Sequence, residues 1–501
     1  MEMEKKITRR QVLSGLLVSG SAAVLAACGA APAATEPTAP AAAAATTAPA
    51  ATAAPAATAA PAATAAPAAT AAPAATAAPA ATVAPAATVA PTVVSATGSG
   101  AKITYWGSFS GGLGEAEQAM VTSFNESQQD VQVEYQFQGS YEETAQKFTA
   151  GLQANTIPDV ILLSDVWWFG FYVGEAIAPL DDLLAAEKVD IADYEPVLLS
   201  EGVRQDKHYW VPFARSTPLF YYNKDIFAEA GLPDQAPATW AEFAEVAPKL
   251  VQKDGETIKR SAFVHPNGAS YVAWLFQGVT WQHGGQYSQP DFTMTMTDPN
   301  TVRAAKFYQD TVNTMGWANL AADVNKEFIG GTAASMMAST GGLAGIQANA
   351  PFKVGVGFLP METAFGCPTG GAGLAIPSAT PDEKKAAAMK YIAFATNPEN
   401  AGVWSRSTGY MPVRISTKQT PDMVKFFEEN PNFKTAVDQL PKTRAQDAAR
   451  VFVRNGDQII GKGLERIIVN KEDVMAVFTD VNAELTTVAG PILEDLKALE
   501  S

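Results

Sequence analysis

Hydrophobic and polar positions follow two different periods in the part of the chain that begins after residue 100. Residues 102–106, 131–137 and 159–163 are apolar runs or alternate apolar with polar side chains, which predicts β-strands. Residues 115–128 and 141–152 repeat apolar side chains every three or four positions, which predicts helices. This order of strand, helix, strand, helix and strand predicts an α/β sheet that is at least partly parallel.

The same alternation continues to the C-terminus. Thr239 to Glu242 has the capping-box pattern that opens a helix, and Asp298 followed by Pro299 is typical of another helix start. The segment of residues 101–501 is longer than a chain that usually folds around a single hydrophobic core. This length predicts two lobes. Strands are predicted at 333–338 and 352–359, and helices at 381–396, at 398–407 and over most of the chain after Pro421.

Aromatic and small polar residues follow each of the first three predicted strands. Trp106 to Ser108 follows the first strand, Gly139 to Tyr141 the second, and Asp165 to Trp168 the third. In an open α/β sheet such loops lie at the carboxyl ends of the strands, where ligands bind. Aromatic faces stack on sugar rings, while hydroxyls and carboxylates bind polar groups. Because Trp167 and Trp168 are adjacent, we expect one of them to face a cleft.

The first 27 residues have the features of a signal peptide. Four basic residues precede an apolar segment, Val12 to Ala27, that is too short to span a bilayer. Leu25 to Cys28 resembles the bacterial lipobox, so we expect a diacylglycerol on Cys28 and anchoring to the cell membrane. Thr8 to Leu13 resembles the twin-arginine export motif, and an ordinary Sec signal with two adjacent arginines is the alternative.

Residues 28–100 separate this signal peptide from the folded part of the chain. After Cys28 the segment consists mainly of Ala, Pro and Thr, with the hexamer Pro-Ala-Ala-Thr-Ala-Ala recurring. It lacks the large apolar side chains that would offset the entropy of ordering, and its regularly spaced prolines prevent a long helix. We interpret it as a disordered tether between the anchor and the lobes.

The charge of the chain and its lack of catalytic motifs exclude several classes of function. The net charge is −16, and removal of the signal peptide, with four basic and two acidic residues, would leave −18. Such an acidic protein is a poor partner for nucleic acid or anionic lipid. The three histidines are scattered, and the sequence lacks nucleotide-binding and nucleophile motifs. We therefore expect no cofactor, no metal site and no catalytic residue.

Several motifs resemble family 1 extracellular solute-binding proteins, which include maltose-binding protein. Ser216 to Asp225 resembles the hinge-region signature of that family, and Asn397 to Ala401 and Thr408 to Pro412 resemble its later motifs. The resemblance covers nearly all of residues 102–415 and is weaker beyond. Finer details are similar to the glycerol-3-phosphate-binding branch, namely Trp106 to Ser108 with Gly114, Gly139 to Glu142, Ala338 to Gly341, and Gly355 to Gly357 ahead of Gly370 to Ala372.

The resemblance implies a periplasmic-binding-protein-like α/β fold. Two α/β lobes, each discontinuous in the chain, would be joined by three hinge crossings and close on the ligand by hinge motion. By analogy the crossings lie near residues 212–217, residues 358–370 and Pro412. The first lobe is then residues 101–213 and 370–412, and the second lobe is residues 214–369 and 413–501.

The resemblance also implies a set of ligand contacts, in which hydroxyls and a backbone N–H donate to phosphate oxygens and a carboxylate accepts from glycerol hydroxyls. The acid of the branch is glutamate, one methylene longer than the aspartate found here. Its arginine has no counterpart cleanly in register, and Arg454, or Arg450, could serve. The set consists of Tyr141, Asp165, Ser216, Ser339, Gly371, Tyr410 and Arg454, with Trp281 and Trp106 as further candidates for stacking.

These features lead to one function and several alternatives. We expect a monomeric lipoprotein outside the cytoplasm that captures glycerol-3-phosphate or a glycerophosphodiester and delivers it to ABC permease subunits. The first alternative keeps the importer role for a neutral sugar or oligosaccharide, and is favoured if no arginine reaches the site. The other classes are a surface glycosidase that uses Asp165 and a second acid, and a structural surface protein.

Overall fold

The computed structural model of the protein describes residues 93–94 and 100–501. All of these residues belong to one compact unit. The predicted signal peptide, the predicted lipidation of Cys28 and most of the predicted tether lie outside the described residues. Among the described residues, none of the helices is both long enough and apolar enough to cross a membrane.

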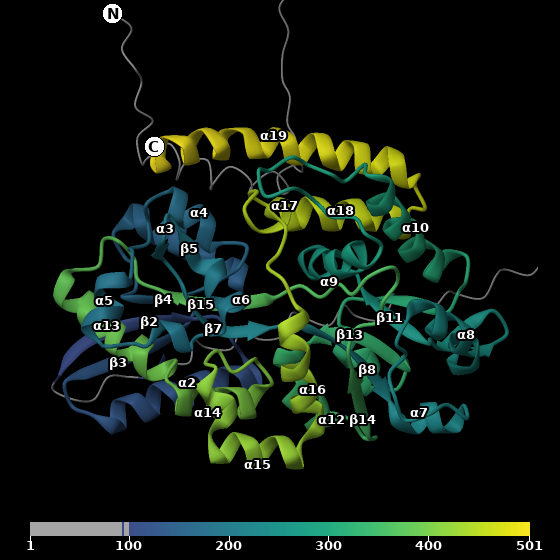
Figure 1. The fold of residues 1–501 in the computed structure, drawn as a ribbon, viewed down its shortest axis with the longest axis horizontal. Coiled ribbons are helices and arrows are strands. Elements are labelled where there is room, and N and C mark those ends of the chain that lie inside the picture. Colours follow the sequence, from purple (N-terminus) through teal and green to yellow (C-terminus); the bar gives the residue numbers. More distant parts are fainter. Residues whose placement is uncertain (1–92, 95–99) are drawn as a thin grey trace, which may run out of the picture. The chain divides into compact units, whose positions relative to one another are not determined.

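The first lobe contains a six-stranded sheet with the order β1-β3-β2-β4-β15-β7 (Figure 1). The strands β3, β2 and β4 pair in parallel, whereas β15 is antiparallel to both β4 and β7, and β1 is antiparallel to β3. The strands of this lobe are β1 (Val93–Val94), β2 (Ala101–Gly107), β3 (Val131–Phe137), β4 (Val160–Ser164), β7 (Val211–Ser216), β15 (Gly370–Ala375) and the hairpin of β5 (Val203–Arg204) with β6 (Lys207–His208). Its helices are α2 (Gly111–Ser127), α3 (Tyr141–Ala154), α4 (Trp168–Val173), α5 (Asp181–Ala186), α6 (Pro196–Leu199), α13 (Asp382–Ala395) and α14 (Pro398–Thr408).

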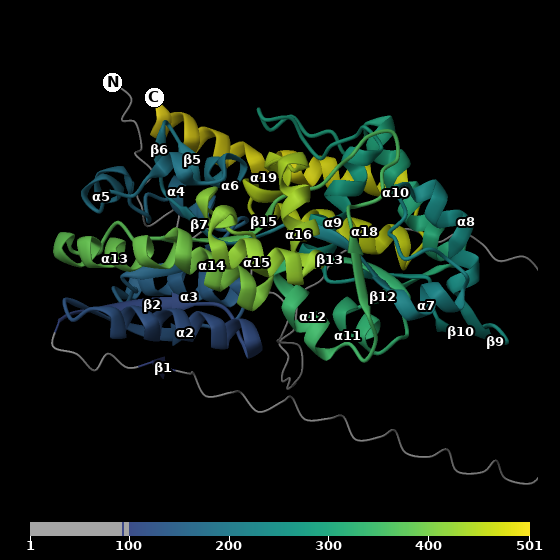
Figure 2. The same cartoon turned by 60° about the horizontal axis from the view of Figure 1, so that its bottom comes forward.

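The second lobe contains a five-stranded sheet with the order β12-β11-β13-β8-β14 (Figure 2). Its strands are β8 (Pro218–Asn223), β11 (Phe263–Pro266), β12 (Ala318–Ala321), β13 (Ser335–Ser339), β14 (Val354–Gly357) and the hairpin of β9 (Gln252–Asp254) with β10 (Thr257–Arg260). Its helices are α7 (Lys224–Glu229), α8 (Trp240–Leu250), α9 (Ala269–Gln282), α10 (Pro299–Asn313), α11 (Val324–Ile329), α12 (Leu343–Asn349), α15 (Pro421–Glu429), α16 (Pro431–Gln439), α17 (Ala448–Val451), α18 (Gly456–Ile468) and α19 (Val474–Glu500).

The chain passes from one sheet to the other three times. The first passage is short, because β7 ends at Ser216 and β8 begins at Pro218. The second is residues 358–369, between β14 and β15. The third follows α14, since α16 packs against β14 of the second sheet. The α/β class and the two sheet-containing lobes confirm the fold that the sequence predicts.

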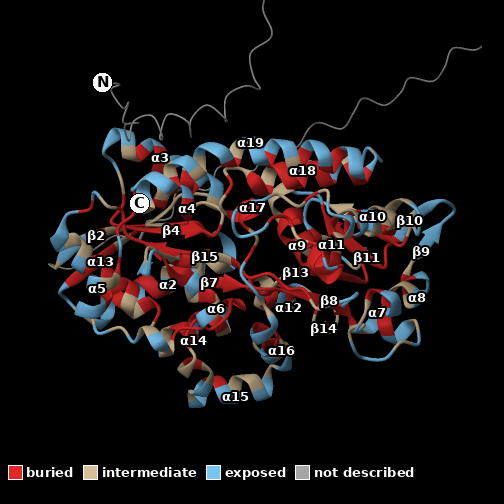
Figure 3. Ribbon diagram, turned by 45° about the horizontal axis from the view of Figure 1, so that its top comes forward, coloured by how far each residue is buried: buried red, intermediate tan, exposed pale blue. Residues whose placement is uncertain are grey.

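The central strands of the two sheets, such as β4, β7 and β8, are buried on both faces, which explains why several of them are continuous apolar runs. Along β4, Val160 and Leu162 belong to one buried cluster, whereas Ile161 and Leu163 belong to another. The two clusters therefore lie on opposite faces of the sheet, as the alternation of side chains along a strand requires. Figure 3 shows the central strands of both sheets buried, whereas the β9–β10 hairpin and the outer faces of the covering helices are exposed.

Helix starts agree with the predicted capping residues. The Thr239 hydroxyl accepts from the Glu242 N–H at 3.1 Å at the start of α8, and Asp298 Oδ1 accepts from the Asn300 N–H at 2.8 Å at the start of α10. The Glu242 side chain accepts from the Ala238 N–H rather than from Thr239, so the capping box is only half formed. Local sequence therefore sets these boundaries.

Candidate ligand-binding site

A cavity of about 390 Å³ lies where the two lobes meet. This volume falls within the range of pockets that bind small molecules. Its walls come from the loops that follow β4 and β13, from the adjoining ends of β7 and β15, and from the N-terminal ends of three helices, α3, α9 and α18. The lining residues are Ser140, Tyr141, Glu142, Ser164, Asp165, Val166, Trp167, Ser216, Ser270, Tyr271, Trp274, Ser339, Gly371, Tyr410, Arg450, Asn455, Asp457 and Gln458.

Tyr141 and Asp165 reach the cavity from the first lobe. Tyr141 is the first residue of α3, whose start is fixed by a capping box between Ser140 and Glu143. Asp165 directly follows β4, and its N–H donates to the Gly371 carbonyl at 2.9 Å. Both residues thus lie just beyond strands of the first sheet, where an α/β sheet binds ligands.

Tyr410 lies beside Tyr141 and extends this wall. The two hydroxyl oxygens are 3.4 Å apart. The Tyr410 ring stacks on Trp404 with the ring centroids 5.7 Å apart, and it also packs against Phe109. Burial raises the pKa of Tyr410 to about 12, so the hydroxyl is protonated at neutral pH and can donate a hydrogen bond.

A buried carboxyl group supports these tyrosines from inside the first lobe. Glu117 is fully buried, accepts hydrogen bonds from the hydroxyls of Tyr105 and Tyr135, and has a backbone hydrogen bond with Phe109. Phe109 in turn packs against Tyr141 with ring centroids 5.6 Å apart. Burial raises the pKa of Glu117 from 4.5 to about 7. The carboxyl group that supports the cavity tyrosines therefore titrates close to physiological pH.

Ser339 reaches the cavity from the second lobe, at the end of β13. Its Oγ accepts from the Gly341 N–H at 3.1 Å, and its own N–H donates to the Tyr271 hydroxyl at 2.9 Å. Tyr271 lies in the first turn of α9 and lines the cavity together with Trp274. These α9 residues carry no signal in the sequence, because they belong to a long apolar run that is typical of a buried helix.

Gly371 and Ser216 form the floor of the cavity, where β15 pairs with β7. Gly371 has φ of +107°, and a Cβ there would lie 2.1 Å from the Ala214 carbonyl oxygen. Glycine is therefore required both by the backbone conformation and by the close approach of the neighbouring strand. This pairing fixes the Gly371 backbone and Ser216, which is 3% exposed, next to each other.

Arg450, and not Arg454, lines this cavity. Arg450 lies on α17 and is 5% exposed; its Nη1 donates to Gln446 and lies 3.6 Å from Asp165 Oδ2. The helix ends at Val451 and Asn455 has φ of +57°, so the chain turns away between the two arginines. Arg454 instead lines a second, smaller cavity. Of the two arginines that the sequence left open, the structure places Arg450 beside the other predicted contacts.

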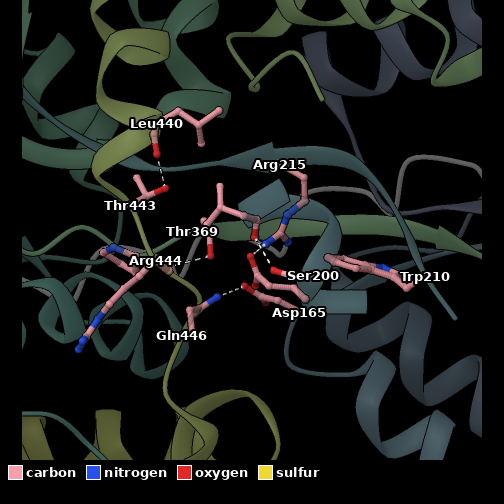
Figure 4. A network of polar contacts seen from close by, with 12 residues as sticks. Asp165, Ser200, Trp210, Arg215, Thr369, Leu440, Thr443, Arg444 and Gln446 are labelled. Atoms are coloured by element: carbon pink, nitrogen blue, oxygen red, sulfur yellow. Dashed lines mark hydrogen bonds and ion pairs between the residues drawn. The ribbon is translucent and has the colours of Figure 1, made fainter. Parts of the chain in front are cut away.

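A buried ion pair lies beneath the floor. The Arg215 side chain is fully buried, and its Nη2 donates to Glu201 Oε1 at 2.6 Å. The guanidinium lies 4.7 Å from the centroid of the Trp210 ring, while Nε and Nη1 have no partner in the described part of the chain. Burial raises the pKa of Glu201, although Arg215 opposes this effect. Figure 4 shows Arg215 beside Asp165, which accepts from Gln446 Nε2 at 2.5 Å.

The adjacent tryptophans Trp167 and Trp168 point to different surroundings. Trp168 is 1% exposed and stacks on Trp210 with ring centroids 6.1 Å apart. Trp167 lines the cavity. One of the pair thus faces the cleft, as the sequence indicates.

Trp281 and Trp106 do not line this cavity. Trp281 is 5% exposed, its Nε1–H donates to Asp447, and the Arg444 guanidinium lies 3.7 Å from the ring centroid. Trp106 lies within β2, and its Nε1–H donates to Gln136 at 3.0 Å. In this arrangement both indoles are engaged by other parts of the protein, which a short sequence motif cannot reveal.

The cavity combines positive and negative features. The N-terminal ends of α3, α9 and α18 carry free N–H groups and the positive ends of helix dipoles, both of which favour an anion. Arg450 adds a full positive charge, whereas Glu142, Asp165 and Asp457 are acidic. The site can therefore bind an anionic group and a hydroxyl-bearing or cationic group at the same time. No cluster of three or more metal-ligating side chains occurs within residues 93–94 and 100–501.

Two relatives are similar in sequence over about two thirds of this chain. The sn-glycerol-3-phosphate-binding periplasmic protein UgpB of Escherichia coli strain K12 is 28% identical over 357 residues, which are 68% of this chain and 80% of the relative. UgpB of Pectobacterium atrosepticum is also 28% identical, over 68% of this chain and 79% of its own length.

Solved structures of solute-binding proteins are also similar to this chain. UgpB from Mycobacterium tuberculosis in complex with glycerophosphocholine is 43% identical and superposes with a TM-score of 0.74, covering 78% of this chain and 98% of that one. The cyclic α-maltosyl-1,6-maltose binding protein from Arthrobacter globiformis, 23% identical with a TM-score of 0.65, covers 79% and 100% and shares the fold. The family described as bacterial extracellular solute-binding protein matches residues 119–435. Because this match spans more than half of the chain, the chain belongs to the bacterial extracellular solute-binding protein family.

Proposed function

We propose that this chain is the substrate-binding protein of an ABC importer and captures glycerol-3-phosphate or a glycerophosphodiester between its lobes. The observation that carries the proposal is Arg450, whose buried Nε has no partner among the described residues, beside three helix N-termini. A guanidinium and helix N-termini are both well suited to phosphate oxygens. The UgpB relatives, named for sn-glycerol-3-phosphate or solved with glycerophosphocholine, support this ligand class.

The cavity residues divide between the two ends of such a ligand. We assign the phosphate to Arg450 and to donors from hydroxyls and the floor backbone. We assign the glycerol hydroxyls to the Asp165 carboxylate, since a carboxylate only accepts hydrogen bonds. The donor set consists of Tyr141, Tyr410, Ser339, Ser216 and the Gly371 N–H.

Binding is proposed to draw the lobes together around the ligand, because donors come from both of them. The lobes of this proposal are residues 101–213 with 370–412 and residues 214–369 with 413–501. One boundary needs correction: residues 214–216 belong to β7 of the first sheet, so the first lobe extends to Ser216 and the second lobe begins at Thr217. The closed form would then dock on permease subunits as a monomer.

The N-terminal segment completes the proposal. A lipidated Cys28, exposed after removal of residues 1–27, would anchor the protein to the outer face of the cell membrane. The Ala/Pro/Thr-rich residues 29–100 would then separate the lobes from the bilayer, and the paired Arg9 and Arg10 would direct export through the twin-arginine route. Mass spectrometry of the mature N-terminus tests the anchor directly.

Calorimetric titration of the purified chain tests the ligand. We expect glycerol-3-phosphate or glycerophosphocholine to bind, and Arg450→Gln to weaken binding by at least about tenfold, because a charge-assisted contact with phosphate is removed. Arg454→Gln is the matched control and leaves the affinity unchanged. Equal losses in the two variants, or no heat with either ligand, contradict the proposal.

A neutral oligosaccharide is the second candidate, and the aromatic lining favours it. Trp167, Tyr271 and Trp274 all line the cavity, and such rings stack on sugars. Maltooligosaccharides in the same titration decide between the two. Binding of the sugars alone, unaffected by Arg450→Gln, would establish this alternative.

A further inference from the structure

The C-terminal helix α19 contacts both lobes. Its first part packs against α18 and α10 of the second lobe, where Val477, Phe478, Val481 and Leu485 are buried. Its last turns contact α4 of the first lobe. Figures 1 and 2 agree that α19 runs alongside α18 and continues to the region of α4. A single helix therefore connects the two bodies that hinge closure must move.

The end of this helix is held to the first lobe by an ion pair. Arg204 donates to Glu500 through Nε at 2.9 Å and through Nη2 at 2.7 Å, and the Tyr172 hydroxyl donates to the same carboxylate at 3.0 Å. The two charged side chains are 26% and 15% exposed. A forked, charge-assisted contact of this kind is directional and so fixes where the helix end can lie.

A weak point separates the two parts of α19. Pro491 lies inside the helix and has no N–H to donate to the preceding turn. Gly490 precedes it, and a Cβ at Gly490 would meet nothing within 4 Å. Glycine and proline together lower the stability of a helix interior and are common where helices bend. Residues 492–500 can therefore move relative to the part that is packed on the second lobe.

Packing beneath residues 492–500 is loose. A cavity of about 70 Å³ lies there, lined by residues of α4, by the chain around Phe452 and by Ile492 and Asp495 of α19. At its side Phe169 of α4 meets Phe452 with ring centroids 4.3 Å apart. Phe452 also meets Trp168, and Phe169 also meets Phe292, so this second contact between the lobes is a small aromatic cluster beside a cavity. An incompletely packed contact contributes less than a filled one.

We propose that residues 492–500, the latch, set the balance between open and closed lobes and thereby set the affinity of the ligand cavity. Glu500 does not line that cavity, so its influence on affinity acts only through the position of the lobes. The latch contact occurs together with the contacts of Arg450 and Gln446 with Asp165 across the cavity, so it stabilises the arrangement in which the lobes meet. When the contact with Arg204 is lost, fewer molecules hold this arrangement before ligand arrives, and the apparent Kd rises in proportion. The latch rests on the lobe closure of the proposed function, and so does the choice of ligand in its test.

The test compares Glu500→Gln with Glu472→Gln. Glu472 pairs with Arg466 at 2.9 Å within the second lobe, so its substitution removes an Arg–Glu pair without touching the lobe contact. Spin labels on Ala150→Cys in α3 and Lys462→Cys in α18 report the lobe separation by pulsed electron resonance. The full chain carries Cys28→Ser, and Cys367 is 1% exposed and escapes labelling.

We expect Glu500→Gln to lengthen the spin–spin distance without ligand and to weaken glycerophosphocholine binding by about two- to fivefold. Glu472→Gln should change neither. Unchanged distances in Glu500→Gln, or the same changes in both variants, would overturn the latch. If the wild type binds no glycerophosphocholine, the proposed ligand fails, while the distances still decide on the latch.

Discussion

Two arginine–glutamate pairs, one under the floor of the cleft and one at the latch, have the same chemistry in different surroundings. Arg215 and Glu201 are 0% and 8% exposed, and Arg204 and Glu500 are 26% and 15% exposed. Each arginine also stands over an aromatic ring, Trp210 in one case and Phe169 in the other. The latch pair makes more hydrogen bonds, because Nε and Nη2 of Arg204 both donate to Glu500 whereas only Nη2 of Arg215 donates to Glu201. The difference with the larger energetic consequence is burial.

That difference determines what each pair can do. A buried pair is costly to break, because the remaining charge stays without solvent or partner. A partly exposed pair contributes little to stability, since water replaces the lost contact. The floor pair is therefore suited to hold β7 and the cavity in one geometry, whereas the latch pair can open and close.

The largest expected effect comes from the floor pair. Arg215→Met should lower the free energy of unfolding by about 3–5 kcal/mol, because it leaves Glu201 buried and uncompensated. Arg204→Met, the matched change at the latch, should lower it by no more than about 1 kcal/mol. Urea denaturation measures both, and equal effects would remove the contrast between floor and latch.

The pH dependence of stability should have opposite signs at Glu117 in the first lobe and at Glu500 in the latch. The pKa of Glu117, beneath the cavity tyrosines, is raised to about 7 by burial. The native state thus holds its proton more tightly than the unfolded chain does, and stability falls as pH rises from 4.5 to 7. The stability of the wild type relative to Glu117→Gln should fall by about 3 kcal/mol over this interval and be constant above it. A constant difference would contradict this account.

At the latch, burial favours a higher pKa of Glu500, but hydrogen bonds from Arg204 and Tyr172 outweigh burial and lower it. The contribution of Glu500 is therefore present above the ordinary glutamate pKa and disappears as pH falls through the lowered value. Relative to Glu500→Gln, the wild type should lose stability towards acid, opposite to Glu117. The same sign at both sites would contradict the contrast.

Substitution of one glycine at the cavity floor and of one glycine in α19 should change stability in opposite directions. Gly371→Ala should lower the free energy of unfolding by about 1–3 kcal/mol, since φ is +107° and the Ala214 carbonyl blocks the new Cβ. Gly490→Ala in α19 should raise it by about 0.5–1 kcal/mol, because the helix gains propensity and nothing obstructs the methyl group. Thermal denaturation of both variants checks the opposite signs.

Single hydroxyls in the cavity should have effects on ligand affinity and little effect on stability. Tyr410→Phe and Ser339→Ala should each weaken glycerol-3-phosphate binding by about 1 kcal/mol, the contribution of one hydrogen bond. The melting temperature without ligand should change little. A loss of melting temperature that parallels the loss of affinity would instead assign these hydroxyls a structural role.

Much of the fold follows from local sequence. The apolar run at 159–163 and the capping residue Thr239 are enough to place β4 and the start of α8, because burial of both sheet faces and capping act over a few residues. Tyr141 and Asp165 could also be placed at a site, since they directly follow strands.

Other parts of the site could not be predicted from the sequence. Tyr271 enters the cavity only because α9 begins there, and its apolar neighbours hide this in the sequence. The turn at Asn455 separates Arg450 from Arg454. The dipeptide Asn455-Gly456 is typical of a turn, but it does not indicate which of the two arginines lines the cavity. The pairing of Glu500 with Arg204 joins positions almost 300 apart in the chain, which depends on the whole fold.

The most direct measurement is a crystal structure of the chain with glycerol-3-phosphate. The account predicts the phosphate within hydrogen-bond distance of the Arg450 guanidinium, and the glycerol hydroxyls beside Asp165. Clear density for the ligand away from Tyr141, Ser339 and Tyr410, or a phosphate that Arg450 does not touch, would contradict it.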